Sequence, residues 1–316
     1  MLAHIVVFAF NRPDHLQRTM SALAANTLAA ESSITVFCDG PRSAAEKERT
    51  DAVLQVAYNI KGFLSVEVVA RDRNLGCGAA IIDGLQRMFA RNERLIIVED
   101  DILCSQHTLT YLNAGLEFYS NDKRIFSISA WSPPPNIFTI PSDYLYDVYA
   151  VPRFNCWGWA SWRDRFFNLD WSILDYRQFK SSPQARKSFD AGGDDMCHML
   201  DLVMAGRLDT WDIRADYGRF KKGQIGINPV RSYTTNIGMG SGVHCLEETT
   251  QYDNDITLAK ANCAFVADID CDAELVQAYR AVYAIQGSRF YHKVRDMLGR
   301  NTPRFIKRII HACLHN

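Results

Sequence analysis

The chain contains no long apolar run, and this absence limits the kind of protein that it can be. Nowhere do roughly 18 apolar residues follow one another, the length that a membrane-spanning helix needs. The first apolar run, residues 5–10, is too short to cross a bilayer and has neither a basic flank nor a small-residue cleavage site. We therefore expect a cytoplasmic protein that touches a membrane, if at all, only at its surface.

The chain also lacks an excess of charge and a pattern of cysteines. Its 35 Lys and Arg against 36 Asp and Glu leave a formal net charge of −1, so the composition does not indicate nucleic acid as a partner. The nine cysteines are scattered, and no two of them form a C-x-x-C pair. The sequence thus predicts neither a zinc cluster nor a disulfide framework, and unpatterned thiols fit a reducing cytosol.

Glycine motifs that mark common enzyme classes are missing as well. Asn11-Arg12-Pro13 follows the first apolar run, where a dinucleotide-binding oxidoreductase would have G-x-G-x-x-G. A sugar nucleotidyltransferase would have a glycine-rich phosphate loop at the same place. No G-x-S-x-G nucleophile elbow occurs, so acyl or peptide hydrolysis has no support.

What the chain does contain is an alternation of short apolar runs and helical patterns over its first 130 residues. Short apolar runs bounded by polar residues are typical of strands buried in a parallel sheet. Strands separated by helices imply right-handed βαβ units. The sequence therefore predicts an α/β fold with a mostly parallel central sheet flanked by helices. The expected strands cover residues 5–10, 34–38, 66–70, 95–98 and 125–129, with a further short strand at 225–229.

Helix starts can also be read from the sequence. Pro13 is well placed for the first turn of a helix. Ser43-x-x-Glu46 resembles a capping box, which predicts that another helix opens there. Trp211-Asp212 precedes a third helical pattern.

The C-terminal end differs from the rest of the chain. No repeat or linker interrupts the first 270 residues, so we expect one domain at 1–270 and a helical extension at 271–316. Residues 287–316 carry seven Lys and Arg against one Asp, and within 303–316 apolar and basic residues fall on different helical faces. This pattern predicts a basic amphipathic helix on an anionic membrane. A helix docked on its own domain or on a second subunit is the alternative.

Three carboxylates, Glu99-Asp100-Asp101, follow directly after the expected strand 95–98. In open α/β sheets, ligands bind outside the carboxyl ends of the strands. Carboxylates this close repel one another unless a cation lies among them, and Mg²⁺ is held by one or two carboxylates together with phosphates and water. The tripeptide predicts a metal–diphosphate site, with a solvated strand end as the alternative. The other strands are followed by Asn11 and Arg12, Asp39, residues 71–74, and Trp131.

Eight short motifs follow one another across roughly residues 5–245. They are Phe10-Asn11-Arg12-Pro13, Phe37-Cys38-Asp39-Gly40, Asn74-Leu75-Gly76, Val98-Glu99-Asp100-Asp101, Ile128-Ser129-Ala130-Trp131, Trp157-Gly158-Trp159, Trp211-Asp212 and Asn236-Ile237-Gly238. In order and approximate spacing they resemble the GT-A class of nucleotide-sugar-dependent glycosyltransferases. Within that class the chain looks most like the N-acetylglucosaminyltransferase I family and the bacterial family-2 enzymes. The resemblance implies a GT-A, Rossmann-like sheet.

The resemblance also implies which residues bind the donor. Asp101 would bind the divalent metal, with Asp100 and Glu99 near the donor ribose and sugar, and Asp39 near the base and ribose. His244 stands where many GT-A enzymes have a histidine that reaches the metal, and a solvated loop histidine is the alternative. The full expected donor site is Phe10, Asn11, Arg12, Asp39, Arg73, Asn74, Glu99, Asp100 and Asp101.

The catalytic base is less clearly marked, because the family pattern is Trp-Asp-Asp and this chain reads Trp211-Asp212-Ile213. Asp212 is the nearest carboxylate and our expected base. Asp194 and Asp195 resemble the acidic motif of family-2 enzymes and are its rivals. Sugar rings can stack on flat aromatic faces, although aromatic clusters also pack in cores. The residues expected to touch acceptor or sugar are Trp131, Trp157 and Trp159.

The resemblance implies inverting, Mn²⁺- or Mg²⁺-dependent transfer of a sugar from a nucleotide-sugar to a hydroxyl. We expect UDP as the nucleotide, GlcNAc as the preferred sugar, and a glycan or lipid-linked glycan acceptor in bacterial surface polysaccharide or lipopolysaccharide assembly. Two alternatives stay open. Ile213 in place of the second acid would suit an inactive, carbohydrate-binding relative, and a sugar nucleotidyltransferase shares much of the topology.

Overall fold

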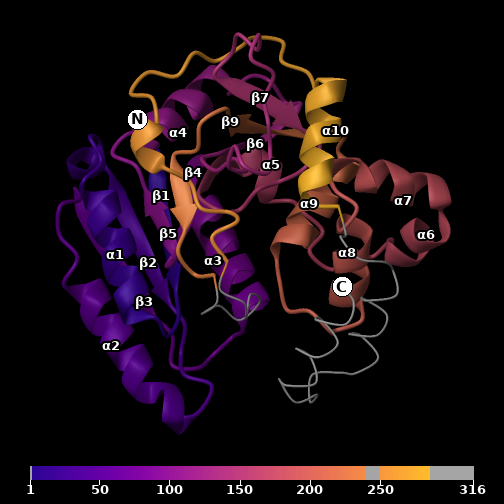
Figure 1. Cartoon of the computed structure of the whole chain (residues 1–316). Helices are drawn as coiled ribbons and strands as arrows, with labels where there is room; N and C mark the ends of the chain where they lie inside the picture. The colour runs from indigo at the N-terminus through magenta and orange to yellow at the C-terminus, as the bar shows by residue number, and fades with distance from the viewer. Residues whose placement is uncertain (1, 240–248, 285–316) are drawn as a thin grey trace.

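An eight-stranded mixed sheet forms the centre of the computed structural model, which describes residues 2–239 and 249–284 (Figure 1). The strand order is β3-β2-β1-β4-β8-β6-β9-β7. Six of these strands point the same way, and β7 and β8 run antiparallel to them. The strands are β1 (His4–Ala9), β2 (Ser33–Cys38), β3 (Ser65–Ala70), β4 (Arg94–Glu99), β6 (Ile125–Ser129), β7 (Val148–Val151), β8 (Trp159–Trp162) and β9 (Ile225–Pro229).

Helices α1 (Pro13–Ala24), α2 (Lys47–Tyr58) and α4 (Thr108–Phe118) cover one face of the sheet. Alternate strand residues point to this face, so Ile5 and Val7 of β1 pack with Leu16 and Met20 of α1. Pro13 lies at the start of α1, where its missing N–H has no intrahelical partner to lose. Apolar residues recur every second position in the strand and about every 3.6 positions in the helix, so each element turns an apolar face to the other.

Helices α3 (Cys77–Arg91), α5 (Arg163–Phe166) and α9 (Asp212–Lys221) cover the opposite face. The intervening residues of β1 point there, and the Phe8 ring stacks on that of Phe37 with centroids 5.4 Å apart. Gly84 of α3 allows this packing, since a Cβ there would lie 2.4 Å from the Phe8 ring. Both faces of the sheet are therefore covered, as the apolar runs predict.

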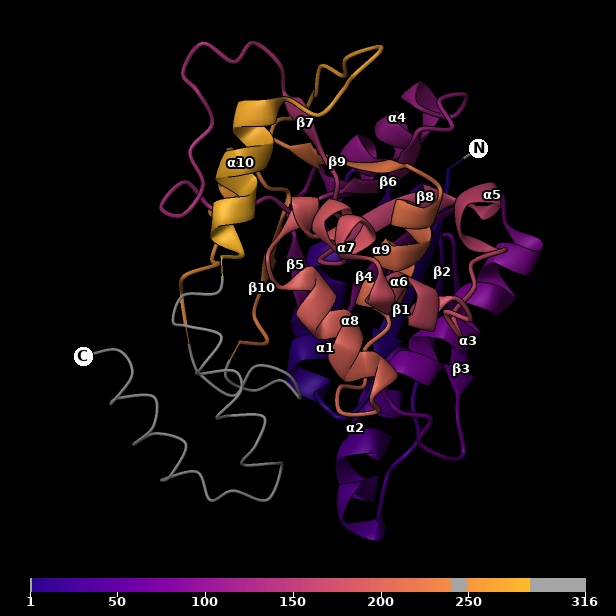
Figure 2. The same cartoon turned by 90° about the vertical axis from the view of Figure 1, so that its right-hand side faces the viewer.

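Helices α6 (Tyr176–Ser181), α7 (Pro183–Phe189) and α8 (Met196–Met204) form a lobe beside the sheet, away from α1 and α2 (Figures 1 and 2). Phe179, Phe189 and Leu200 lie in its own apolar cluster. Helix α10 (Ala273–Val282) packs on β7 through Leu275 and Tyr279. The lobe and α10 thus lie on the side of the molecule opposite α1 and α2 (Figure 1).

The expected mostly parallel α/β sheet flanked by helices is confirmed. The antiparallel strands β7 and β8 were not expected, because short aromatic segments such as Trp159–Trp162 carry no periodic signal. A second small sheet pairs β5 (Ile102–Cys104) with β10 (Thr234–Asn236).

The capping-box prediction at residues 43–46 is wrong. Ser43 makes no side-chain cap hydrogen bond, and Glu46 instead accepts the backbone N–H of Arg42 at 3.0 Å. A short 3₁₀ turn, η2 (Ala44–Glu46), precedes α2, which begins at Lys47. The Glu46 carboxylate therefore binds the backbone N–H of Arg42 and not that of Ser43, which a capping box requires.

Some predicted features lie partly or wholly outside the described residues. The extension predicted at 271–316 is described only as far as residue 284, where it includes α10. The basic segment 303–316 and His244 lie outside the described residues. Among the helices of the described ranges, none has the length and apolar character needed to cross a membrane.

Candidate functional site

A cavity of about 340 Å³ opens at the carboxyl ends of β1, β2 and β4. Phe10, Asp39 and Glu99 reach it from these three strand ends. Met199 of α8 and Asp212 of α9 line its other side. The cavity thus lies between the parallel half of the sheet and the helical lobe, at the place where open α/β sheets bind ligands.

Arg12 lies between two of the three carboxylates that follow β4. Its guanidinium forms an ion pair with Asp100, and Nη2 lies 3.0 Å from Oδ2 of Asp101. Burial alone would lower the pKa of Arg12, but Asp101 and Asp100 raise it above its ordinary value. The backbone of Asp100 is held as well, because the Thr19 hydroxyl donates a hydrogen bond of 2.8 Å to the Asp100 carbonyl oxygen. Asp100 is therefore a buried partner of Arg12.

Glu99 is half-buried beside this ion pair, and its carboxylate makes no hydrogen bond or ion pair with any described residue. Burial raises the pKa of Glu99 well above its ordinary value, and the negative charges of Asp101, Asp100 and Asp212 raise it further. Four carboxylates thus share one guanidinium in this part of the cavity. Such an excess of negative charge is costly unless a proton or another cation is present.

The donor set suits a divalent cation that a substrate helps to hold. Within residues 2–239 and 249–284, no group of three or more His, Cys, Asp and Glu side chains could bind a metal by itself. Mg²⁺ and similar hard cations use one or two protein carboxylates and complete their shell with phosphate oxygens and water. Gly238 leaves space at Asp101, since a Cβ there would lie 2.1 Å from Oδ2. The residues present therefore fit the expected metal.

Asp39 and Arg71 form the opposite end of the cavity. The Leu75 N–H and the Asn74 side-chain amide donate to Asp39 at 3.1 and 2.9 Å, and Arg71 Nη1 lies 3.8 Å from Asp39 Oδ1. Burial raises the pKa of Asp39, although the Leu75 amide and Arg71 oppose this shift. The Arg71 side chain is 8% exposed, and its Nε has no hydrogen-bond partner among the described residues. A buried donor without a partner beside a cavity calls for an acceptor on a ligand.

The mouth of the cavity combines an aromatic ring with a cation. The Arg42 guanidinium lies over the ring of Phe10, 4.7 Å from its centroid. Asn11 also lines the cavity and donates to Glu46 at 3.5 Å. Arg73, in contrast, is exposed and does not line the cavity. Its backbone passes over Gly40, where a Cβ would lie only 2.5 Å away.

Of the three carboxylates considered for the base, the structure brings Asp212 to the cavity. The Thr210 hydroxyl donates to Asp212 Oδ1 at 2.5 Å. Asp195 instead forms two hydrogen bonds, of 2.7 and 2.9 Å, with Arg153, and Asp194 pairs with Arg280. Neither of them lines the cavity.

Only one of the three tryptophans reaches the cavity. Trp157 is half-buried and lines it, with its ring centroid 4.7 Å from that of Trp131 in an edge-to-face contact. Trp131 is 2% exposed and Trp159 is not exposed at all, and neither lines the cavity. Trp159 lies in the core between Phe166 and Trp211. Trp131 thus supports Trp157, and Trp159 supports the start of α9.

Several residues that line the cavity do not belong to the expected site. Arg71 is among the residues 71–74 that follow the third expected strand, but the expected donor site included only Arg73 and Asn74 of this loop. Thr210 had no motif to mark it. The remaining missed residues with polar or sulfur side chains are Arg42, Cys77, Cys156, Met199, Asn236 and Met239.

No protein-family model matches the sequence, and no curated protein matches it either. Among solved structures, the chain is similar to TarS from S. aureus, with a TM-score of 0.44 and 11% identity over 74% of this chain and 60% of that one. It is similar to GalNAc-T7 bound to UDP, GalNAc and Mn²⁺, with a TM-score of 0.44 and 15% identity over 72% and 42% of the two chains. A third match is the mannosyltransferase PcManGT from Pyrobaculum calidifontis, in complex with GDP-Man and Mn²⁺. It gives a TM-score of 0.37 and 16% identity over 52% and 46%.

The chain spans 60% of the length of the TarS structure. The identities are low, so the chemistry of this chain has to come from the residues of its own cavity.

Proposed function

We propose that this chain is a metal-dependent glycosyltransferase that moves a sugar from a nucleotide-sugar, with inversion, to a hydroxyl of a glycan acceptor. The observation that carries the proposal is the composition of the cavity at the strand ends. It joins a carboxylate cluster suited to a cation, at Asp101 and Glu99, to a buried polar pair, Asp39 and Arg71. A separate carboxylate, Asp212, comes from another element.

Asp39 and Arg71 support a nucleobase as the group bound at their end. Asp39 offers carboxylate oxygens, and the unpartnered Arg71 Nε–H offers a donor. This pair complements a ring edge that carries an N–H beside a carbonyl oxygen. Uracil has such an edge, in its N3–H and the carbonyl oxygens beside it. We therefore propose UDP as the nucleotide and UDP-GlcNAc as the first donor to test.

The carboxylate cluster supports a diphosphate at the centre of the cavity. Mn²⁺ or Mg²⁺ held by Asp101, with Glu99 beside it, would stabilise the negative charge that develops on the leaving diphosphate. Arg12 keeps Asp100 and Asp101 in place through its ion pairs with both of them. Removal of the Arg12 side chain would therefore displace Asp100 and Asp101 and would also leave the carboxylate cluster more negative.

Asp212 is the proposed general base. Its carboxylate accepts the proton of the acceptor hydroxyl while that oxygen forms a bond to the anomeric carbon. The bond from the anomeric carbon to the diphosphate oxygen breaks in the same displacement, and the nucleoside diphosphate leaves with the bonding electrons. Thr210 holds one carboxylate oxygen, Oδ1, by its hydrogen bond. Ile213, at the second acid of the family pattern, is buried in the lobe and cannot take this role.

The acceptor side of the cavity is aromatic and apolar. Trp157 presents a half-buried ring to the cavity, and Met199 and Leu208 also line it. Such surfaces suit the apolar faces of sugar rings. We propose a glycan or lipid-linked glycan acceptor in surface polysaccharide or lipopolysaccharide assembly. The basic sequence of residues 303–316 supports action in the cytoplasm at the inner membrane face.

Calorimetric titration of UDP, GDP and their sugar conjugates tests the proposal, with Mn²⁺ and with EDTA. We expect one nucleotide to bind only with metal, and Asp101→Ala to abolish that binding. Asp51→Ala, at an exposed carboxylate of α2 paired with Lys47, is the matched control and should bind normally. Incubation with acceptor hydroxyls should release nucleoside diphosphate. Binding without any release would favour the inactive relative, and release of pyrophosphate from a nucleoside triphosphate and a sugar phosphate would favour a nucleotidyltransferase.

A further inference from the structure

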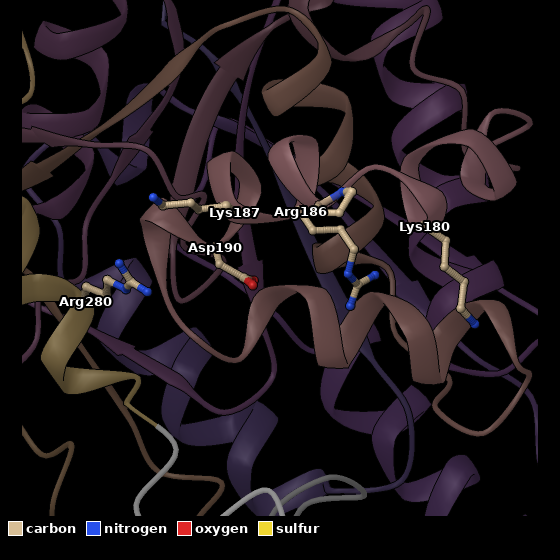
Figure 3. A pocket seen from close by; sticks show the side chains of 6 residues that line it. Lys180, Arg186, Lys187, Asp190 and Arg280 are labelled. Atoms are coloured by element: carbon tan, nitrogen blue, oxygen red, sulfur yellow. The ribbon is translucent and has the colours of Figure 1, made fainter.

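A second pocket, of about 480 Å³, lies between α6, α7 and α10 and is lined by four basic side chains (Figure 3). They are Lys180 of α6, Arg186 and Lys187 of α7, and Arg280 of α10. Asp190 and Pro183 complete the lining. The basic residues come from segments far apart in the sequence, so the tertiary fold assembles this cationic surface.

The two arginines are held in place and still have donors to offer. Arg186 makes two hydrogen bonds of 3.0 Å to Asp201, and Arg280 donates from Nε to Asp194 at 2.6 Å. A guanidinium carries five N–H donors in a rigid fork, so each arginine keeps further donors beyond these bonds. The carboxylates orient both side chains, as the supporting groups of a binding site do.

The remaining carboxylate in the pocket is already engaged. Asp190 accepts the backbone N–H of Cys197 at 2.8 Å, at the start of α8. Lys187 makes no hydrogen bond or ion pair with any described residue, and the Lys180 ammonium lies over the Tyr176 ring, 5.5 Å from its centroid. In Figure 3 the Lys187 and Arg280 side chains extend from different helices toward the same space. Asp201 and Asp194 pair with the two arginines, so the positive charge that these carboxylates leave uncompensated lies on the two lysines.

This basic pocket is separate from the cavity at the strand ends. Helix α8 lies between them: Cys197 and Asp201 contact α7 and its neighbours, whereas Met199 lines the cavity. Residues two apart on a helix face away from each other, which explains how one helix serves both sites. None of the residues that line the basic pocket lines the cavity.

We propose that the basic pocket binds a phosphate group carrying two or more negative charges. Arginine forks match phosphate oxygens bidentately, and lysines add point charges that a multiply charged group attracts more strongly than a single carboxylate. Two sources share this chemistry, the phosphate of a lipid headgroup and that of a soluble compound. The proposal does not depend on the proposed transfer of a sugar.

Titration of inorganic pyrophosphate into the full chain in EDTA tests the proposal. EDTA suppresses metal-dependent binding in the cavity, and Arg71→Ala, which alters the cavity, should leave pyrophosphate binding unchanged. Lys180→Gln with Lys187→Gln should weaken that binding about tenfold. Lys47→Gln with Lys123→Gln is the matched control, because it removes the same charge from lysines elsewhere, paired with Asp51 and Asp164.

The two double variants distinguish binding in the basic pocket from general attraction of an anion to a positively charged surface. Absence of pyrophosphate binding, or an equal loss in both double variants, would overturn the proposal. If the first double variant melts at a lower temperature than the wild type, Arg280→Gln provides a second variant with the same expected weakening. Sedimentation with vesicles of phosphatidic acid, against phosphatidylcholine vesicles, then identifies the source. A loss of sedimentation in Lys180→Gln with Lys187→Gln assigns a lipid phosphate, and unchanged sedimentation with lost pyrophosphate binding assigns a soluble one.

Discussion

The Thr210 hydroxyl donates a 2.5 Å hydrogen bond to Oδ1 of Asp212, joining the segment before α9 to the first residue of that helix. Trp211 between them is 2% exposed and stacks on Trp159, with ring centroids 5.6 Å apart. The buried ring fixes the backbone, and the hydroxyl fixes the carboxylate. Asp212 is therefore held at the wall of the cavity by packing and by a hydrogen bond together.

This arrangement makes a prediction for the base. Asp212→Asn should lower kcat by about 10²- to 10⁴-fold, the range for loss of a general base, while UDP still binds. Thr210→Val should lower kcat about fivefold, as expected for one lost hydrogen bond of roughly 1 kcal/mol, and Thr210→Ser should restore it. Asp194→Asn, at the exposed rival, is the control. Full activity in Asp212→Asn with lost activity in Asp194→Asn would move the role to the rival.

Arg71 makes a prediction for nucleotide recognition. Arg71→Met should weaken UDP binding about tenfold to hundredfold, since a hydrogen bond from a charged donor contributes roughly 1.5–3 kcal/mol. Arg73→Met removes the same charge two residues away from an exposed side chain and should leave the dissociation constant unchanged. Calorimetry with UDP and GDP measures both variants. Equal effects of the two substitutions would show that only long-range charge matters here.

The carboxylate cluster makes a prediction for pH dependence in the absence of metal. The pKa of Glu99 is raised well above 4.5 by burial and by its neighbours, and burial raises the pKa of Asp100 to about 6. The folded state then holds these protons more tightly than the unfolded state. The resulting stability is fully present below the unfolded pKa values and is lost as pH rises through the folded ones.

The melting temperature in EDTA should therefore fall as pH rises from about 5 to about 8. Glu99→Gln should flatten this fall, because its amide has no proton to release. Mn²⁺ should raise the melting temperature most at the higher pH, where the cluster carries its full charge. A slope in Glu99→Gln equal to that of the wild type would contradict the assignment of the effect to Glu99.

The close approach of Gly238 to Asp101 leads to a prediction for metal-dependent binding. A Cβ at this position would lie 2.1 Å from Asp101 Oδ2 and 2.9 Å from Arg12 Nη1. Gly238→Ala should displace Asp101 and weaken Mn²⁺-dependent nucleotide binding by about tenfold or more, by analogy with the cost of other groups that orient metal ligands. The melting temperature in EDTA should change little, because the loop lies at the edge of the cavity. Normal binding in this variant would show that the loop yields to the added methyl group.

Residues 303–316 make a prediction for membrane association. Their deletion should reduce sedimentation with anionic vesicles, because the sequence of this segment places basic and apolar residues at the spacing of an amphipathic helix. Nucleotide binding should be unaffected, since no part of the described cavity comes from these residues. Unchanged sedimentation after the deletion would remove the support for a membrane-facing role.

The sequence by itself determined the parallel strands and the identity of the residues that follow them. Apolar runs of strand length, each ended by a polar residue, require burial on both faces and bring their carboxyl ends to one edge. Asp39 and Glu99 could be predicted at the cavity for this reason, and both line it. Strands β7 and β8 were not predicted, because four residues are too few to show a period.

Only the tertiary structure decided which loop residues face the cavity. Arg71 faces it and Arg73 does not, because the chain turns over Gly40 directly after β3. Asp212 faces the cavity because the buried Trp211 anchors the start of α9 at the cavity wall. Asp195 does not face the cavity, and both of its carboxylate oxygens accept hydrogen bonds from Arg153. The direction of a loop side chain depends on turn geometry and on partners distant in the sequence, and neither is encoded in the local pattern of residues.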